Sequence, residues 1–332
     1  MIPQKVTIIG VVDAVLSVMT LPGTLRPLNP LRDLMAVADL IELCFHGTID
    51  AEGRSFLHDL RRTSRGSGLA DWAARTSDLA GMPLSGFVWE DSGQVVGNVS
   101  LIAFNRRGRR ITLIANVAVH PDYRRRGIAR NLTQRALLAA RQRSGHEIWL
   151  QVRDDNPGAI KLYEELGWRE KARRTTWRVA PGQPVEPASP RLRVFRRAAQ
   201  DWARQSEWFA QSYPQLISWY YPSFWDSFRP GIWNSFQRFL GDMSLREWSA
   251  YEDAHLSGVL VAQSSPGRGD YLWAAVPPEA ADDSLHALLA EARNALPQRH
   301  SLTFDYPAYE GVEAIQRAGF IPHRTLIWMR AD

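Results

Sequence analysis

The sequence has little cysteine, little lysine and no apolar run long enough to cross a bilayer as a helix. Its one cysteine among 332 residues, Cys44, excludes an intramolecular disulfide. Cys44 stands in an apolar segment of helical period, where a small buried side chain is expected. Lysine stands only at positions 5, 161 and 171, and arginine supplies the other basic side chains. These features predict a cytoplasmic protein without a transmembrane segment.

The first 22 residues are the most apolar stretch of the chain. Residues 6–19 resemble the core of a signal peptide, but Asp13 interrupts them and Pro22 with Gly23 makes a turn where a cleavage site would follow. We interpret residues 1–22 as an extension that packs on the protein, on a partner subunit or on a membrane surface.

A proline-rich stretch at residues 181–190 divides the chain. Its four prolines prevent both a helix and a central strand, and 332 residues suffice for two domains. Charge differs across this stretch: 26 basic and 19 acidic residues precede Ser189, a net +7, and 14 basic and 16 acidic residues follow it, a net −2. The sequence therefore predicts a basic domain at 23–180, a linker at 181–190 and a second domain at 191–332.

The first half alternates between helical and strand periodicity. Apolar residues at helical spacing predict helices near 30–45, 54–62, 129–140 and 157–166, while apolar runs bounded by turn residues predict strands near 87–90, 95–104, 111–119, 148–152 and 168–179. Short turns between the 87–119 strands favour antiparallel pairing. The pattern indicates an α/β (α+β) fold with a mixed, mainly antiparallel sheet flanked by helices.

The second half repeats this order. Residues 302–320 align without a gap on residues 150–168, which pairs Phe320 with Trp168 at an offset of 152. Gly258 likewise matches Gly97 at an offset of 161. We infer a diverged internal duplication whose two halves share one fold.

Residues 116–130, NVAVHPDYRRRGIAR, combine a strand, a basic glycine-containing loop and a helix start. Amide groups at a helix N-terminus and the helix dipole favour a bound phosphate, and Gly127 allows close approach of the backbone. The arginines can add charge-assisted hydrogen bonds. A second segment at residues 152–168 places Asn156 before a proline-started helix and Tyr163 on the same helical face as Ala159.

Both segments resemble the two motifs of the GNAT superfamily of N-acetyltransferases, and residues 124–129 match its signature at every defined position. The resemblance implies transfer of an acetyl group from acetyl-CoA, as cosubstrate, to a primary amine by direct attack in a ternary complex. It implies backbone contacts of Val117, Ala118 and Val119 with the pantetheine arm, and Tyr163 as the general acid. The remaining cofactor-binding residues are then Arg124, Arg125, Arg126, Gly127, Ile128, Ala129, Arg130, Asn156 and again Tyr163.

The general base and the acceptor remain open. Asn116 stands where many family members carry a glutamate, and Glu90, His46, His58, His120 or a water are the candidates. The acceptor is a small amine or a protein amine, for the segment around Tyr163 is similar to that of ribosomal-protein N-terminal acetyltransferases. No metal site and no nucleic-acid partner are expected, and a homodimer is possible.

The second half has lost this chemistry. Residues 278–283 offer neither glycine nor cation, and Ile315 takes the place of Tyr163, so we expect a degenerate GNAT-like domain that does not bind acetyl-CoA. Aromatic residues crowd positions 202–239, as a packed helical layer, the roof of an acceptor pocket or a dimer face. The alternative function for the whole chain is a non-catalytic acyl-CoA sensor or scaffold.

Overall fold

The computed structural model describes residues 22–49, 51–64, 84–106, 108–143, 145–179, 182–221, 228–231, 244–265, 269–277, 281–296 and 302–332. Residues 1–21 of the expected N-terminal extension lie outside these ranges. The same holds for residues 222–227 and 232–243, which include part of the aromatic-rich segment.

The first half of the chain has the element order expected from the sequence. In chain order it forms β1 (Thr24–Pro27), α1 (Pro30–Phe45), α2 (Ala51–Ser64), β2 (Ser85–Asp91), β3 (Gln94–Arg106), β4 (Arg109–Val119), the 3-10 turn η2 (Pro121–Tyr123), α4 (Ile128–Arg141), β5 (His146–Arg153), α5 (Pro157–Glu165) and β6 (Trp168–Val179).

The second half repeats the strand order, as the internal alignment predicts. It forms β7 (Leu192–Arg196), the 3-10 turn η3 (Ala199–Asp201), α6 (Trp202–Ser212), α7 (Gln215–Ser218), β8 (Ser244–Glu252), β9 (His255–Ser265), β10 (Gly269–Ala275), α9 (Ala281–Ala295), β11 (Leu302–Pro307), α10 (Val312–Arg317) and β12 (Phe320–Ala331).

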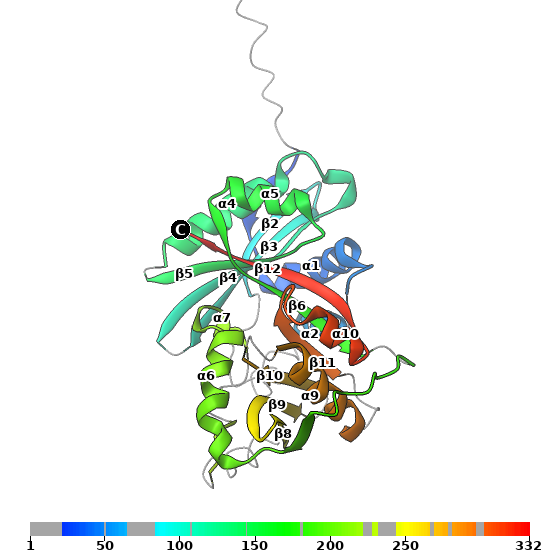
Figure 1. Cartoon of the computed structure of the whole chain (residues 1–332). Helices are drawn as coiled ribbons and strands as arrows, with labels where there is room; N and C mark the ends of the chain where they lie inside the picture. Colours follow the sequence, from blue (N-terminus) through cyan, green and yellow to red (C-terminus); the bar gives the residue numbers. More distant parts are fainter. Residues whose placement is uncertain are drawn as a thin grey trace, which may run out of the picture. The chain divides into compact units, whose positions relative to one another are not determined.

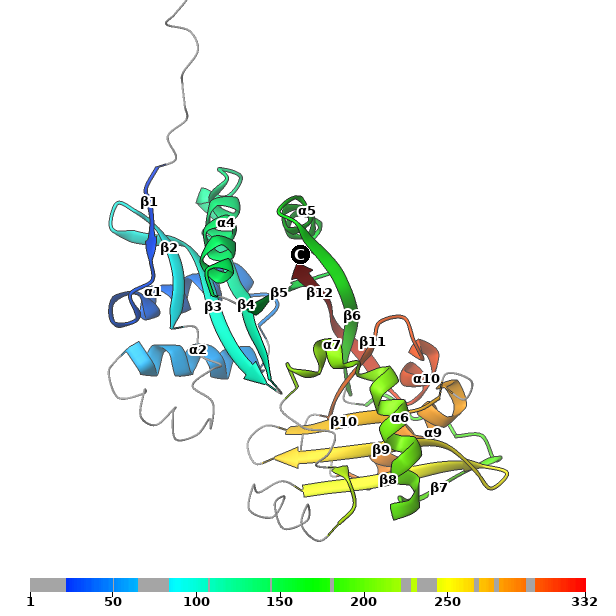
Figure 2. The same ribbon diagram turned by 90° about the vertical axis from the view of Figure 1, so that its left-hand side faces the viewer.

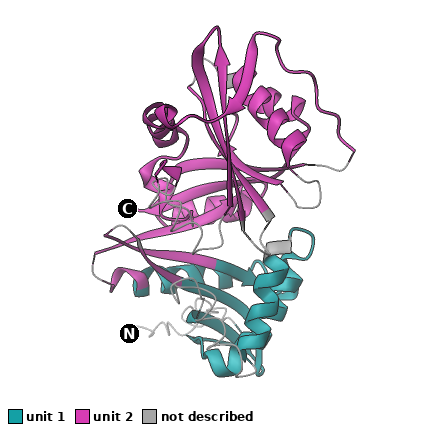
Figure 3. Ribbon diagram, turned by 90° about the horizontal axis from the view of Figure 1, so that it is seen from below, with its two compact units in different colours: residues 1–101, 116–139 teal, residues 102–115, 140–332 magenta. Residues whose placement is uncertain are grey.

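The chain forms two compact units (Figure 3). Unit 1 comprises residues 1–101 and 116–139, and unit 2 comprises residues 102–115 and 140–332. Strands β3 and β4 therefore each contribute residues to both units. Neither unit coincides with one half of the sequence.

Unit 1 packs α1 and α2 against β2 (Figure 2). Its sheet pairs β1 with β2 and β2 with β3, both antiparallel. Helix α1 begins after Asn29, whose side chain accepts a hydrogen bond from the amide of Leu31 at 3.1 Å. The core beneath the two helices consists of buried aliphatic side chains: Leu28, Leu34, Val37, Ala38, Ile41, Leu57, Leu60 and Val88.

Unit 2 is built on a mixed sheet in the order β4-β5-β12-β6-β11-β10-β9-β8-β7, and Figure 1 labels these strands except β7. Strand β12, which ends the chain, lies between β5 and β6 and pairs antiparallel with both. Strand β6 lies in turn between β12 and β11. The closing strands of the two halves are thus exchanged within one sheet.

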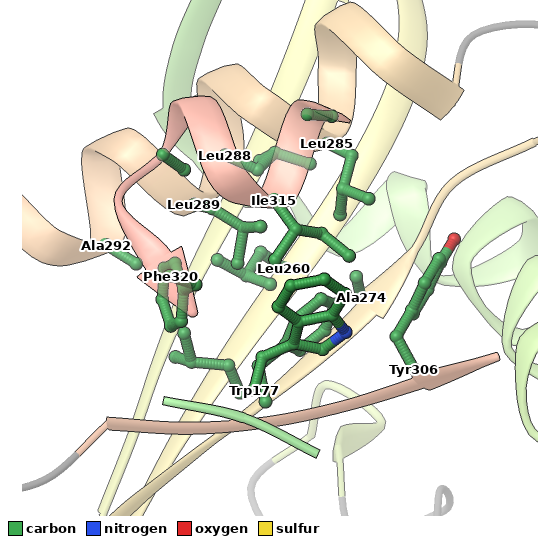
Figure 4. Close-up of a cluster of buried hydrophobic side chains, with 14 of the residues drawn as sticks. Trp177, Leu260, Ala274, Leu285, Leu288, Leu289, Ala292, Tyr306, Ile315 and Phe320 are labelled. Carbon is green, nitrogen blue, oxygen red and sulfur yellow. The ribbon is translucent and has the colours of Figure 1, made fainter. Parts of the chain in front are cut away.

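Two apolar layers cover the two faces of the β8–β10 strands. Helices α9 and α10 bury leucines and Ile315 against Leu260, Ala274 and Phe320 on one face (Figure 4). Aromatic side chains of α6 and the residues after it cover the other face, including Trp208, Phe209, Tyr213, Trp219 and Tyr221. The described part of the aromatic-rich segment is therefore a packed layer.

In the part of the chain that the structure describes, every helix is too short or too polar to serve as a membrane span.

Candidate functional site

Strand β4 changes character halfway along its length. It pairs in parallel with β5 from Arg110–His146 to Ile114–Leu150, and within the described residues this pairing goes no further, although β4 continues to Val119. Asn116 has a φ of 52°, in the left-handed region that is unusual for a strand residue. The backbone of Val117, Ala118 and Val119 therefore follows a bulge.

A buried polar cluster in unit 1 holds this bulge. The Asn98 amide donates a hydrogen bond to the Asn116 carbonyl at 2.9 Å, and the side-chain amides of both residues donate to Ser100 Oγ at 3.3 Å. Asn98 and Ser100 are 0% and 1% exposed. The sequence analysis did not single out this pair, although two polar residues at alternate positions of an apolar strand face the same way.

The basic loop after β4 adopts a conformation suited to anion binding. His120 and Pro121 lead into η2, where their carbonyls accept hydrogen bonds from the amides of Tyr123 and Arg124. Arg125 and Gly127 then have φ values of 61° and 82°. Left-handed residues beside right-handed ones direct successive amide groups to one side, which is the backbone geometry of anion-binding nests.

The side chains of the loop are tied to backbone carbonyls. Arg124 Nε donates to the Val119 carbonyl at 3.1 Å, and Arg126 Nη2 donates to the Asp122 carbonyl at 2.8 Å. The Arg126 guanidinium also lies 5.0 Å from the centre of the Tyr123 ring. Arg124, Arg125, Arg126 and Gly127 remain exposed, so the loop is accessible to a ligand from solvent.

Helix α4 begins with Ile128, and its first amides have no intrahelical acceptor. Ile128 is 1% exposed because it packs under β3, where Gly97 leaves the space. A Cβ atom at Gly97 would lie 3.0 Å from Ile128 Cγ2 and 2.9 Å from Leu132 Cδ1. The glycine therefore sets how closely α4 approaches the sheet. Ala129 and Arg130 follow in the first turn of α4.

Asn156 and Tyr163 belong to unit 2, whereas the ten other predicted cofactor residues belong to unit 1. Asn156 caps α5, and its Oδ1 accepts a hydrogen bond from the Ala159 amide at 3.1 Å. Tyr163 is buried, with its ring against Trp168 at 6.1 Å. Burial raises the pKa of Tyr163 to about 12, so the phenol keeps its proton at neutral pH.

The four candidate bases all lie in unit 1 and differ in surroundings. Glu90 is paired with Arg26 and Arg32, whose hydrogen bonds hold its pKa below the usual range. His46 and His58 are exposed on the α1–α2 side. His120, between β4 and η2, accepts a weak hydrogen bond at Nδ1 from the Asp122 amide at 3.4 Å. Of the four, His120 alone adjoins the basic loop.

In the second half, strands β10 and β11 correspond to β4 and β5 of the first half. Side chains of the second half occupy the ends of these two strands. Among the described residues, strands β10 and β11 pair in parallel from Asp270–Leu302 to Leu272–Phe304 and no further. Just beyond, the Tyr213 hydroxyl accepts a hydrogen bond from the Ala274 amide at 3.3 Å and donates to the Asp305 carbonyl at 3.1 Å. Ile315, in place of a tyrosine, is fully buried among leucines (Figure 4).

A charged network secures Tyr213 in that position. Arg174 is 2% exposed, and its guanidinium lies 4.6 Å from the centre of the Tyr213 ring. Arg174 Nε donates to Asp305 Oδ1 at 2.7 Å, and the Tyr221 hydroxyl donates to the same oxygen at 2.9 Å.

Within the described ranges, no three His, Cys, Asp or Glu side chains gather in a way that could hold a metal ion.

Comparison with known proteins agrees with this geometry. A sequence model of the acetyltransferase (GNAT) family matches residues 50–168. The [ribosomal protein bS18]-alanine N-acetyltransferase of Escherichia coli is 40% identical over 62 residues, 19% of this chain and 42% of that enzyme. N-alpha-acetyltransferase 30 of Schizosaccharomyces pombe is 36% identical over 87 residues, 26% of this chain and 58% of that protein. This chain thus spans about half the length of these relatives.

Among solved structures, a GCN5-related N-acetyltransferase from Sphaerobacter thermophilus has a similar fold. Its TM-score is 0.57 at 16% identity, and the match covers 94% of this chain and 96% of that one. The fold therefore corresponds over nearly the whole chain, while the sequence model of the family matches residues 50–168. Residues 50–168 thus form a domain of the acetyltransferase (GNAT) family.

Proposed function

We propose that this chain transfers an acetyl group from acetyl-CoA to a primary amine. The observation that carries the proposal is the loop of residues 124–129, where exposed arginines, a left-handed Arg125 and Gly127 lead into the N-terminus of α4. A diphosphate needs several converging donors of this kind. The bulge at Asn116 supports the further proposal that Val117, Ala118 and Val119 offer backbone groups to the pantetheine arm.

In the proposed reaction a neutral amine attacks the thioester carbonyl. An amide of the 117–119 segment would stabilise the negative charge that develops on the carbonyl oxygen. As the C–N bond forms and the C–S bond breaks, the thiolate of coenzyme A takes the Tyr163 proton, and the amine gives up one proton to His120 or to water. Burial raises the pKa of Tyr163 to about 12, so the phenol carries its proton when the reaction begins.

We propose an N-terminal protein amine or a small primary amine as the acceptor. The two named relatives are described as a ribosomal protein bS18-alanine N-acetyltransferase and an N-alpha-acetyltransferase, which favours a protein amine. In this proposal residues 23–180 carry the reaction in the cytoplasm, 181–190 connect the halves, and 191–332 bind no acetyl-CoA. The absence of acetyl-CoA binding by residues 191–332 is supported by Tyr213, because its hydroxyl already accepts the hydrogen bond of the Ala274 amide.

The test is steady release of coenzyme A from acetyl-CoA in the presence of a panel of small amines and peptides. Wild-type protein should turn over, and Tyr163→Phe should lower kcat by about 100-fold or more with little change in the Kd for acetyl-CoA. Tight binding without turnover by the wild type would instead favour the acyl-CoA sensor. Turnover unaffected by Tyr163→Phe would remove the tyrosine from the mechanism.

A further inference from the structure

An arginine-lined groove of about 750 Å³ lies on strand β7 in unit 2. Strand β7 is the last strand in the described sheet order, so β8 pairs with one of its edges only. Arg191, Arg193 and Arg196 line the groove, and Asp253 is its one acidic lining residue. The groove is far in sequence from both motifs, and acetyl transfer does not account for it.

The three arginines lack partners among the described residues. Arg191, Arg193 and Arg196 are exposed and form no ion pair within that part of the chain. Arg197, next in the chain, shows the contrast: its guanidinium donates to Glu247 Oε2 at 2.8 Å. A cluster of uncompensated cations is matched by a ligand that brings carboxylates or phosphates.

The groove also offers an apolar floor. Phe195 is 53% exposed, and its ring meets that of Tyr251 at 6.2 Å with an interplanar angle of 60°. The Tyr251 hydroxyl donates to Asp201 Oδ1 at 2.9 Å, which fixes the ring. Because Tyr251 lies opposite Arg193 in the β7–β8 register, both rings share a face with that arginine.

We propose that this groove binds an extended acidic peptide segment of a partner protein, which adds a strand to the free edge of β7. Arg193 and Phe195 lie on one face of β7, about 7 Å apart, and Arg191 precedes them in the turn that leads into the strand. An extended peptide with acidic residues at every second position has the same spacing. Its backbone can use the amides and carbonyls of β7 that point away from β8, except the Leu192 amide, which donates to the Ser189 carbonyl at 3.1 Å.

The geometry disfavours two other occupants. A second copy of β7 would bring its own three arginines against these, and such charges commonly prevent edges from pairing with themselves. A nucleic acid would find an inclined ring pair instead of a flat stacking surface, with Asp253 beside its phosphates. An acidic peptide satisfies both the charge and the free edge.

Fluorescence anisotropy on the full chain tests the proposal with three labelled probes of matched length. These are a peptide that alternates glutamate and valine, the same peptide with lysine for glutamate, and a single-stranded oligonucleotide of equal negative charge. The first should bind, and the lysine peptide should not. Methylation of alternate backbone amides in the acidic peptide should weaken binding, because it removes donors that strand pairing needs.

Charge reversal locates the site. Arg191→Glu with Arg193→Glu should weaken binding of the acidic peptide by about tenfold or more. Arg204→Glu is the matched control, because Arg204 is exposed on α6 outside the groove and should leave the Kd within about twofold. Arg193→Gln is a milder variant, because it removes one charge without reversing it. Circular dichroism and the midpoint of thermal unfolding check that each variant is folded.

Several results would overturn the proposal. Equal affinity for the acidic and lysine peptides would show no charge selection. An unchanged Kd in a folded Arg191→Glu, Arg193→Glu variant or in Arg193→Gln would place the peptide elsewhere. Tighter binding of the oligonucleotide than of the acidic peptide would assign the groove to nucleic acid. None of these outcomes bears on acetyl transfer, so this proposal and the proposed function fail separately.

Discussion

At the scale of single residues, Tyr163 links burial to a measurable pH dependence. Its phenol has a pKa of about 12 in the folded chain, above the ordinary value of 10. The folded state therefore holds the proton between pH 10 and 12 while the unfolded chain releases it. The stabilising contribution is complete below pH 10 and is lost as the pH rises through 12.

At alkaline pH, the Tyr163→Phe variant should accordingly lose less of its free energy of unfolding than the wild type does. The free energy of unfolding of the wild type should fall between pH 10 and 12 by roughly 2–3 kcal/mol more than that of the variant. Urea denaturation of both proteins at pH 8, 10 and 11.5 measures the difference. Parallel curves for the two proteins over this range would contradict a buried, protonated phenol.

Asn98 is a second residue whose effect can be isolated. Its side-chain amide supports the left-handed Asn116 through a 2.9 Å hydrogen bond to the carbonyl. Asn98→Ala should lower the free energy of unfolding by about 1–3 kcal/mol, because the half-buried Asn116 carbonyl loses its donor. Asn98→Ala should also weaken coenzyme A binding, because in the proposed function the bulge at Asn116 orients the backbone of residues 117–119 toward coenzyme A. Asn98→Ser is the milder comparison, and unchanged binding in folded Asn98→Ala would separate the cluster from the cofactor site.

At the scale of helices and strands, two glycines repeat one packing arrangement. Gly97 on β3 lies under α4, and Gly258 on β9 lies under α9, where an added Cβ would be 3.0 Å from Leu288 Cδ1. Both positions were aligned from the sequence at an offset of 161. Their common role indicates that the halves share close contact between the helix and the sheet.

Gly97→Ala and Gly258→Ala form a matched pair of variants. Each should destabilise the protein by about 1–3 kcal/mol through overpacking. Only Gly97→Ala should also weaken coenzyme A binding, because α4 presents the basic loop and α9 does not. Thermal denaturation and calorimetric titration separate the two effects. Equal loss of affinity in both variants would show that stability, and not the placement of α4, controls binding.

The helices were predictable because their signals are local. Asn29 and Pro30 begin α1, and apolar residues at helical spacing extend it to Phe45 as expected. Helix α2 is longer than the predicted 54–62 because its first three residues, Ala51, Glu52 and Gly53, include no large apolar side chain that would mark a helical period. The Arg124–Ala129 loop could be picked out from the sequence for the same reason, since its motif is local. Asn98 could not, because it acts by a hydrogen bond to Asn116, 18 positions away.

At the scale of the molecule, the exchange of β6 and β12 could not be predicted. Both strands follow a helix and a glycine, Gly167 in one half and Gly319 in the other, and both end their own half. Because β6 and β12 have the same sequence pattern, either could pair next to β5. Only contacts between residues far apart in the sequence decide which one does. The sequence boundary at 181–190 therefore separates segments whose strands interleave in unit 2.

This exchange predicts that the first half is not stable alone. A fragment of residues 1–180 lacks β12, which pairs with β5 through residues 326–331 and with β6 through residues 320–331. Two strands would then lose a neighbour in the middle of the sheet. The fragment should show no cooperative thermal transition by circular dichroism. A sharp transition near that of the full chain would mean that β5 and β6 can pair directly.

The central claim is that the backbone turn after Tyr123 binds the diphosphate of coenzyme A. Isothermal titration of coenzyme A and of 4′-phosphopantetheine, which lacks the diphosphate, into wild type and Gly127→Val measures this directly. We predict that wild type binds coenzyme A at least about tenfold more tightly than phosphopantetheine and that Gly127→Val, strained at a φ of 82°, loses this preference. Equal affinity of wild type for the two ligands, or a preference that survives in folded Gly127→Val, would contradict the account.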